Sequence, residues 1–367
     1  MRTTCLLALS IVLLASCNAE LEKTTSEAFK QSIKGTAQGT TWRIVYYDLQ
    51  ERDFTPQVDS ILNDIDASVS TYLPGSTIDT WNKSDSGTTI DALFLELLVK
   101  SWEVYGLTNG AFDPTVKPLV SFWGFGPERL SHPEVVDSAL IDSLLQLVAF
   151  DSLSLRRDDR SIHLDEFVNQ GNQTSEFFLH KPLPGIQLDF NAIGQGWSVD
   201  KVAEFLKSKG LKRFFVEIGG ELVAGYPKPG GEMWRFGIDK PSDGNMDREL
   251  QAVINLRNKG LATSGNYRKF YERNGVRYSH TIDPTTGYPV QHPLLSATVV
   301  SESAGKSDAL ATAFMVMGAD STIEFLGARN YVGAYVYLIS DDQQGGYATY
   351  VSRQIAGLLE VDEEGGP

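Results

Sequence analysis

Two oxygen-bearing side chains stand four residues apart at the start of a strongly apolar stretch, residues 307–318 (SDALATAFMVMG). In a helix, Asp308 and Thr312 would lie on one face, one turn from each other. A carboxylate and a hydroxyl that point the same way can bind a hard cation such as Mg²⁺. Asp and Thr also favour the first turn of ordinary helices, so this segment by itself leaves a capping role open.

Three further segments place a carboxylate beside glycine. In 110–115 (GAFDPT), Asp113 precedes a proline, which holds its backbone extended. In 188–196 (LDFNAIGQG), Asp189 precedes a glycine-rich turn that opens a predicted helix, where backbone groups can meet a phosphate or a metal. In 216–221 (VEIGGE), two glycines follow a buried strand and permit close approach of a ligand. A turn aspartate or a β-bulge would give the same local patterns.

Two ring-bearing residues are candidates for a proton acceptor and a stacking platform. His280 stands in a predicted strand that runs into the turn 283–287 (DPTTG). An unperturbed histidine, with a pKa of about 6.5, suits a general base. Tyr72 follows the first predicted helix in 70–74 (STYLP) and could stack on a planar ring. A structural histidine and a half-buried tyrosine are the alternatives.

Helices and strands must bring these segments together. Apolar periodicity predicts helices at 57–67, 91–106, 196–209 and 307–317. Strands are predicted at 42–47, 213–218, 234–238, 251–256, 276–282, 295–301, 331–339 and 347–351. Strands that come in runs between a few helices, without regular βαβ alternation, favour an α+β fold with mostly antiparallel sheets and packed helices. Residues 128–187 are less patterned and are interpreted as short elements or as a lobe inserted over the core, and 356–367 as an acidic tail.

Composition limits the classes of function. A formal net charge of −15 disfavours nucleic acid as a partner, because neutralising phosphates requires clustered Lys and Arg. Anionic cofactors remain compatible with this charge, since backbone amides and a metal can bind them. The chain has no G-x-G-x-x-G after a first strand and no Walker A lysine loop, so dinucleotide-binding Rossmann and P-loop folds lack their defining residues.

The N-terminus carries a targeting segment. The apolar run 6–14 is too short to span a bilayer, which takes about 20 residues, and it fits a signal peptide over residues 1–16. Residues 14–17 (LASC) resemble a bacterial lipobox, which implies that Cys17 is lipid-modified and becomes the new N-terminus. An ordinary signal peptide with a chance cysteine is the alternative. Residues 17–33 are then a polar tether, and we expect a lipid-anchored protein that faces the periplasm, held by the inner membrane.

Taken in chain order, these segments resemble the ApbE family, the bacterial FAD:protein FMN transferases. The resemblance covers about residues 35–320. The matching segments are 39–41, 70–72, 110–114, 123–126, 189–196, 217–221, 263–265, 280–287 and 307–312. It implies an ApbE-like (T-fold-like) catalytic domain over residues 34–355.

The resemblance also implies a role for individual residues. Asp308, Thr312 and the backbone carbonyl of Ala192 would hold Mg²⁺, with Mn²⁺ as an alternative. His280 would be the catalytic base, and Asp308 is expected to be catalytic as a metal ligand. The residues expected to line the FAD site are Gln38, Tyr72, Ala111, Phe112, Asp113, Asp189, Gln195 and Ile282. The chain departs from the family at Gln38, where Met is frequent, and at Gln195, where Lys or Glu is usual.

The implied reaction transfers the FMN moiety of FAD to a threonine hydroxyl of a partner protein, releases AMP and leaves phosphodiester-linked FMN. The implied acceptors are subunits of membrane redox complexes, either the sodium-pumping NADH:quinone reductase or the Rnf type. Two alternatives remain open: an FAD pyrophosphatase that uses water as acceptor, and a non-catalytic flavin-binding lipoprotein. Asp308, Thr312 and His280 argue against the second, because binding alone needs no metal beside the pyrophosphate.

Overall fold

The computed structural model describes residues 28–360, apart from 127, 129–131, 134–135, 158–159, 170–175, 242–248, 268–269, 274, 329–332 and 343–345. The predicted signal peptide, Cys17 and most of the predicted tether lie outside the described residues, as does the end of the predicted acidic tail.

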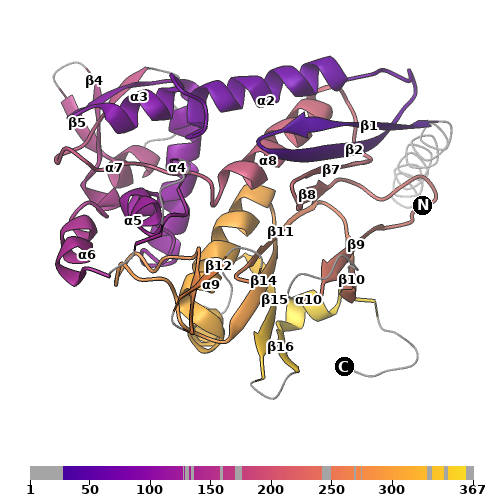
Figure 1. The fold of residues 1–367 in the computed structure, drawn as a ribbon. Coiled ribbons are helices and arrows are strands. Elements are labelled where there is room, and N and C mark those ends of the chain that lie inside the picture. Colours follow the sequence, from indigo (N-terminus) through magenta and orange to yellow (C-terminus); the bar gives the residue numbers. More distant parts are fainter. Residues whose placement is uncertain are drawn as a thin grey trace, which may run out of the picture.

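An antiparallel sheet of eight strands forms the centre of the described structure (Figure 1). In spatial order the strands are β1 (Phe29–Ala37), β2 (Thr40–Asp48), β7 (Phe214–Ile218), β8 (Glu221–Ala224), β11 (Lys259–Gly265), β14 (Leu294–Ser301), β15 (Ala334–Asp341) and β16 (Tyr347–Val351). Each neighbouring pair is antiparallel. The predicted α+β class with mostly antiparallel sheets is confirmed.

Apolar alternation along the strands decides what covers each face. Trp42, Ile44 and Tyr46 on β2 are buried against the helices α2 (Thr55–Val69) and α8 (Gly194–Ser208). Val45 points to the other face, because successive strand residues alternate. There it joins a cluster with the ribbon β9 (Trp234–Asp239) and β10 (Leu250–Leu256) and the short helix α10 (Arg353–Ala356).

The long helix α9 (Ala304–Ala328) packs on the sheet at β11 and β14 and against α8. Among the described helices it alone is long and apolar enough to cross a bilayer. Phe314 and Leu310 are nevertheless fully buried in the largest core cluster, and Gly318, at φ +78°, interrupts the helix. We therefore interpret α9 as a core helix. The sequence predicts that the helix stops at Gly318, and in the structure the backbone is non-helical there before a further helical stretch runs to Ala328.

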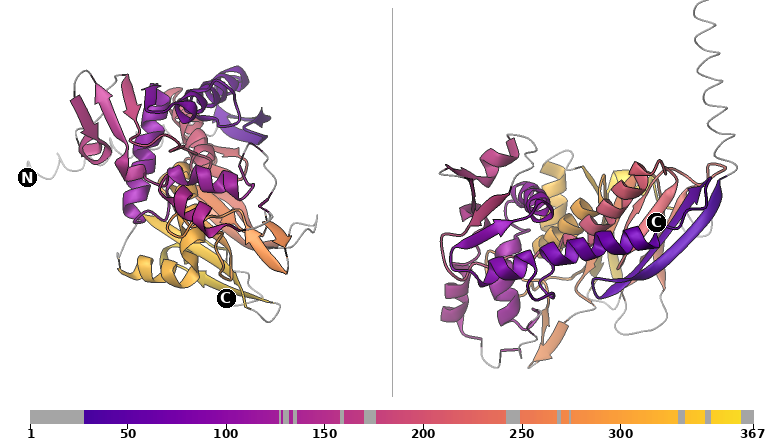
Figure 2. Two further views of the ribbon diagram at one scale, coloured as in Figure 1. Left: turned by 60° about the vertical axis from the view of Figure 1, so that its left-hand side comes forward. Right: turned by 90° about the horizontal axis from the view of Figure 1, so that it is seen from above.

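A second, smaller layer lies at the opposite end of the molecule from β1 and β2, with α2 running between the two (Figures 1 and 2). Its sheet has the order β3 (Gly87–Ile90), β6 (Phe177–His180), β4 (Ser154–Arg157) and β5 (Arg160–His163). Its helices are α3 (Thr77–Lys83), α4 (Ala92–Leu107), α5 (Lys117–Phe122), α6 (Ser138–Leu145) and α7 (Leu164–Asn169), with 3₁₀ turns η1 (Pro114–Val116) and η2 (Phe150–Ser152).

This layer differs from the predicted inserted lobe at 128–187. The edge strand β3 comes from before α4, and one continuous cluster joins Phe94 on α4, Phe177 on β6 and Phe314 on α9. Residues 128–187 therefore complete a layer that shares its core with the large sheet. Their weak pattern reflects strands of only four residues each.

Both ends of the folded part extend beyond the predicted limits. Phe29 to Ile33, predicted as tether, pair with β2 in the edge strand β1, whose alternation between exposed and half-buried positions gives little apolar signal. At the other end, Leu359 bridges to Ile254, and the backbone N–H of Glu360 donates to the carbonyl of Val253 (2.9 Å). The fold thus runs past residue 355.

Candidate active site

The first turns of α8 and α9 are in direct contact. A Cβ on Gly196 would lie 2.4 Å from the carbonyl oxygen of Ala304 and 2.9 Å from the Cβ of Asp308, so only glycine allows this approach. The backbone N–H of Gly196 donates to Oδ2 of Asp308 (3.2 Å). Oδ1 of Asp308 accepts no hydrogen bond from the described residues. The predicted cation ligand therefore lies at the start of α8.

Asp308 lies in an unusually acidic, buried position. Its side chain is 6% exposed, and burial raises its pKa well above the ordinary value. The negative charges of Glu221 and then Asp200 raise the pKa further, while the hydrogen bond from Gly196 lowers it. Neighbouring carboxylates that repel one another favour the uptake of a proton or a cation at this place.

Thr312 lies one turn further along α9, as the spacing predicts. Its Oγ1 is 3.2 Å from the Oγ of Ser264 on β11, and beside Ser264 the hydroxyls of Thr263 and Thr298 are 2.8 Å apart. Ala192 lies in the tight turn before α8, where the N–H of Gly194 donates to the carbonyl of Phe190 (2.7 Å). Carboxylate, hydroxyl and carbonyl oxygens are the donors a hard cation such as Mg²⁺ prefers, so these residues fit that ion chemically.

No group of three or more His, Cys, Asp or Glu side chains that could hold a metal occurs among the described residues. The expected site has a single carboxylate, and its other protein ligands would be a hydroxyl and a carbonyl. Mg²⁺ bound by few protein ligands normally keeps several waters.

Two predicted carboxylate segments lie side by side, because the N–H of Asp189 donates to the carbonyl of Pro114 (2.8 Å). Asp113 accepts hydrogen bonds from the N–H (2.7 Å) and hydroxyl (2.5 Å) of Thr115, and burial raises its pKa to about 6. Asp189 retains some exposed surface, yet enough protein surrounds its carboxyl that burial raises its pKa. It accepts from the backbone N–H of Asn191 (2.8 Å).

The two residues before Asp113 differ in accessibility. Phe112 is 2% exposed and belongs to the largest core cluster, so its side chain supports the segment from inside. Ala111 is half-buried at the edge of the same cluster. Of the pair, Ala111 has the more accessible side chain.

An aromatic stack holds the hairpin that leads to His280. The hairpin consists of β12 (Phe270–Arg273) and β13 (Val276–Ser279), so the predicted strand 276–282 ends before His280. Tyr271 and Tyr278 stack with ring centres 5.1 Å apart, and Trp123 stacks on Tyr278 at 5.7 Å. The rings of the half-buried His280 and of Phe125 lie edge to face, with their centres 6.3 Å apart.

Further contacts connect the region of His280 to the rest of the site. The indole N–H of Trp123 donates to the carbonyl of Gly287 (2.8 Å), and Ile282 is buried in the same small cluster as Trp123. Thr281 donates from its hydroxyl to Oδ1 of Asn266 (2.6 Å), two residues beyond Ser264. This chain of contacts leads from His280 to the strand end that faces Thr312.

The two glutamines that depart from the family pattern both lie at α8. Gln38 occupies the tip of the β1–β2 turn with φ +51°, and its Nε2 donates to the hydroxyl of Ser198 (2.8 Å). Gln195 lies in the first turn of α8, with its amide against Gly219. Tyr72, by contrast, is 65% exposed in the loop after α2.

The sequence analysis did not identify Asp200, which also lies in this region. Asp200 on α8 accepts hydrogen bonds from the first two N–H groups of α9, those of Ala304 (2.8 Å) and Gly305 (2.9 Å). Burial raises its pKa to about 6. The available signal was its position four residues after Gly196, which puts both on one face of α8.

Known proteins are similar to this chain in both sequence and fold. The FAD:protein FMN transferase of Haemophilus influenzae is 33% identical over 340 residues, covering 90% of this chain and 92% of that protein. The FAD:protein FMN transferase of Vibrio cholerae is 33% identical over 356 residues, covering 95% of this chain and 97% of that protein.

Solved structures agree. The flavin transferase ApbE from Vibrio cholerae superposes with a TM-score of 0.74 at 31% identity, covering 90% of this chain and all (100%) of the other. The apo flavinyl transferase ApbE from Pseudomonas stutzeri gives 0.75 at 30% identity, covering 90% and 97%. A model of the ApbE family matches residues 38–336, which include every predicted site residue except the lipidation cysteine. This chain therefore belongs to the ApbE family.

Proposed function

We propose that this flavin-transferring enzyme moves the FMN moiety of FAD to a threonine hydroxyl of a partner protein and releases AMP. The names of its relatives support FAD as the flavin donor and a protein as the acceptor. The observation that carries the finer proposal is Asp308, a buried carboxylate with a second oxygen ligand one turn away, held against the start of α8. Cleavage of a pyrophosphate is the chemistry that such a cation site suits.

Asp308, Thr312 and the carbonyl of Ala192 would hold Mg²⁺ or Mn²⁺. When bound, the ion supplies charge neutralisation at the pyrophosphate oxygens. The raised pKa of Asp308 supports this assignment, because burial beside Glu221 and Asp200 leaves a carboxylate that a cation would stabilise. The N-terminal end of α8 adds backbone N–H groups and a positive helix dipole, which favour a phosphate nearby.

His280 would accept the proton of the attacking hydroxyl. The threonine oxygen forms a bond to the phosphorus on the FMN side, the bond from that phosphorus to the bridging oxygen breaks, and AMP leaves with that oxygen. The rings of His280 and Phe125 lie edge to face, and the Tyr271–Tyr278 stack supports the hairpin that leads to the histidine. A positioned general base contributes roughly 10²–10⁴-fold to rate.

FAD would extend from this centre along the joined segments of Asp113 and Asp189, with Ala111, Ile282, Gln38 and Gln195 around it and Tyr72 as a stacking ring. Gln38 and Gln195 both border the first turns of α8, so they would contact the phosphate half. Their neutral amides donate hydrogen bonds without adding charge.

We further propose that Cys17 is lipidated, that the enzyme faces the periplasm from the inner membrane, and that its acceptors are flavin-carrying subunits of the sodium-pumping NADH:quinone reductase or Rnf type. The signal-like residues 1–17 support the anchor. Metabolic labelling with a fatty-acid probe should mark the wild-type chain, whereas Cys17→Ala should remain unlabelled.

The transfer reaction is tested with the full chain, FAD, Mg²⁺ and an Rnf- or reductase-type acceptor domain. Covalent flavin fluorescence on a denaturing gel and AMP release are measured together. We expect a fluorescent acceptor band that disappears with EDTA or in Asp308→Ala. Asp320→Ala, at an exposed position on the same helix, is the matched control and should keep activity. AMP release without the band would favour the pyrophosphatase, and bound FAD with neither product would favour the flavin carrier.

A further inference from the structure

The starts of α8 and α9 cap each other. The first N–H groups of any helix lack acceptors within the helix. In α8 the N–H of Gly196 donates to Asp308 of α9. In α9 the N–H groups of Ala304 and Gly305 donate to the two carboxylate oxygens of Asp200 on α8 (2.8 and 2.9 Å). Each helix therefore supplies an aspartate to the other, and the two starts are tied in both directions.

The starts of α8 and α9 are so close that little space remains between their backbones. A Cβ on Gly305 would lie 3.1 Å from the N of Trp197 and 3.2 Å from Oδ2 of Asp200. On the opposite side, a Cβ on Gly196 would overlap the carbonyl of Ala304. With glycine on both helices, the separation of the two helix starts is set by backbone contact and by the Asp200 hydrogen bonds.

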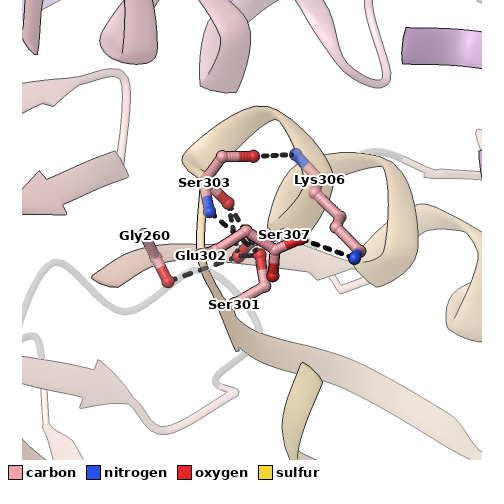
Figure 3. Close-up of polar contacts among 6 residues, drawn as sticks. All are labelled: Gly260, Ser301, Glu302, Ser303, Lys306 and Ser307. Carbon is pink, nitrogen blue, oxygen red and sulfur yellow. Dashed lines mark hydrogen bonds and ion pairs between the residues drawn. The ribbon is translucent and has the colours of Figure 1, made fainter. Parts of the chain in front are cut away.

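The other polar contacts at the start of α9 are made within its own first turn or with the large sheet. Ser303 accepts from the N–H of Lys306 (3.2 Å), which caps α9 from its own chain (Figure 3). Ser307 lies 2.9 Å from the hydroxyl of Ser301 on β14 and donates to the carbonyl of Gly260 on β11 (3.3 Å) (Figure 3). These contacts tie α9 to the sheet, whereas Asp200 ties it to α8.

We propose that Asp200 is a positioning residue for the cation site. Two of the expected ligands, Asp308 and Thr312, are on α9, and the third, the carbonyl of Ala192, precedes α8. Mg²⁺ requires near-ideal octahedral geometry at short distances, so a shift of one helix start against the other separates the ligands. Asp200 prevents that shift while touching neither substrate nor ion. This inference rests on the proposed function, because it takes Mg²⁺ as the cation held by Asp308.

The test compares Mg²⁺ binding by isothermal titration into the FAD-loaded, full-length chain in detergent. Asp200→Asn replaces one acceptor by an N–H donor that faces a backbone N–H. Ser303→Ala is the matched control, because it removes a cap from the same helix start without cutting the link to α8. We expect at least a tenfold rise in the Mg²⁺ dissociation constant for D200N and less than twofold for S303A. A shift in D200N no larger than that in S303A overturns the proposal.

A second variant separates spacing from charge and from stability. Gly305→Ala keeps the Asp200 charge and replaces glycine by a better helix former, but its Cβ presses on the N of Trp197. We expect several-fold weaker Mg²⁺ binding by a chain that still folds, as its thermal unfolding would show. Unchanged Mg²⁺ affinity in G305A overturns the proposal whatever D200N shows, including a failure of D200N to fold. A wild-type chain that binds no Mg²⁺ would instead overturn the cation in the proposed function, and this inference with it.

Discussion

Asp200 and Lys181 are two buried charged groups that bond to backbone groups of the fold. Asp200 accepts from two N–H groups at a helix start. Lys181 is the opposite case: it is 1% exposed, and its Nζ donates to the carbonyls of Trp81 (3.1 Å), Asn82 (3.3 Å) and Ile186 (2.9 Å). The Trp81 ring centre lies 4.5 Å from the same ammonium. Because buried charges are costly without partners, both residues hold together segments that are distant in sequence.

Lys181 should make stability depend on pH in the alkaline range. Burial lowers its pKa from 10.5 to about 8. Between these values the unfolded chain binds more protons than the folded one, so stability rises with pH, by at most about 3 kcal/mol from this group. Urea unfolding at a series of pH values should show this rise in the wild type relative to Lys181→Met. Parallel pH profiles for the two chains would contradict it.

His280 is tested as the base by His280→Gln, which keeps a polar side chain of similar length. The rate of flavin transfer should fall by roughly 10²–10⁴-fold, because the hydroxyl loses its proton acceptor, while FAD affinity should change little. Single-turnover transfer and flavin fluorescence titration measure the two quantities. His163→Gln, at an exposed position on β5, is the control and should behave as the wild type. Equal activity in both variants would remove His280 from the mechanism.

At the scale of the elements, α9 contributes both to the candidate site and to the core. Its first turns carry Asp308 and Thr312 to the site, whereas its later turns cover the core. Gly318, with φ +78° and ψ 173°, changes the helix direction between the two parts, and the ring of His292 lies against it. The Nε2 of His292 is 2.8 Å from the carbonyl of Met315, so it occupies a carbonyl near the break.

Replacing either of two glycines of α9 by alanine should change the stability of the chain in opposite directions. Gly318→Ala should destabilise the chain by about 1–3 kcal/mol, because its backbone region is nearly restricted to glycine and its Cβ would lie 3.0 Å from the His292 ring. Gly327→Ala has an open position and ordinary φ, and should stabilise by up to about 1 kcal/mol. Thermal unfolding of both variants checks the pair. A neutral Gly318→Ala would mean that α9 can run straight.

At the scale of the whole molecule, the segment after β16 connects the β9–β10 ribbon to the large sheet. Ser352 accepts from the N–H of Val336 (2.9 Å) on β15, and Ile355 is fully buried in the cluster on that face. Further on, Glu360 forms two hydrogen bonds of 2.6 Å with Arg235 on β9. The segment therefore bridges two sheets on the face opposite α8.

The two contacts of this segment should contribute unequally to the free energy of unfolding. Ile355→Ala should cost about 2–4 kcal/mol, because it leaves a cavity in a closed cluster. Arg235→Gln removes an exposed ion pair and should cost much less, because solvent screens such pairs. Flavin transfer below the unfolding temperature should be unchanged in both, since neither touches the site. Denaturant unfolding ranks them, and an equal or reversed order would contradict the prediction.

Features that depend on local geometry could be predicted from the amino-acid sequence. The spacing of Asp308 and Thr312 specifies a shared helix face, because residues four apart always meet in a helix. The order of strands and helices, without regular βαβ alternation, favoured an α+β fold with mostly antiparallel sheets. The glycine-rich segments were recognisable because positions of close approach require glycine.

Which of these elements come into contact could not be predicted from the sequence. Asp200 and Ala304, or Gly196 and Asp308, are far apart in the chain, and no local period relates them. The edge strand β1 and the bridge at Leu359 carry little apolar pattern, because their stability comes from pairing with β2 and β10. Long-range contacts depend on burial and hydrogen bonding across the whole fold. The mutual capping of α8 and α9 therefore emerges only when the chain has folded.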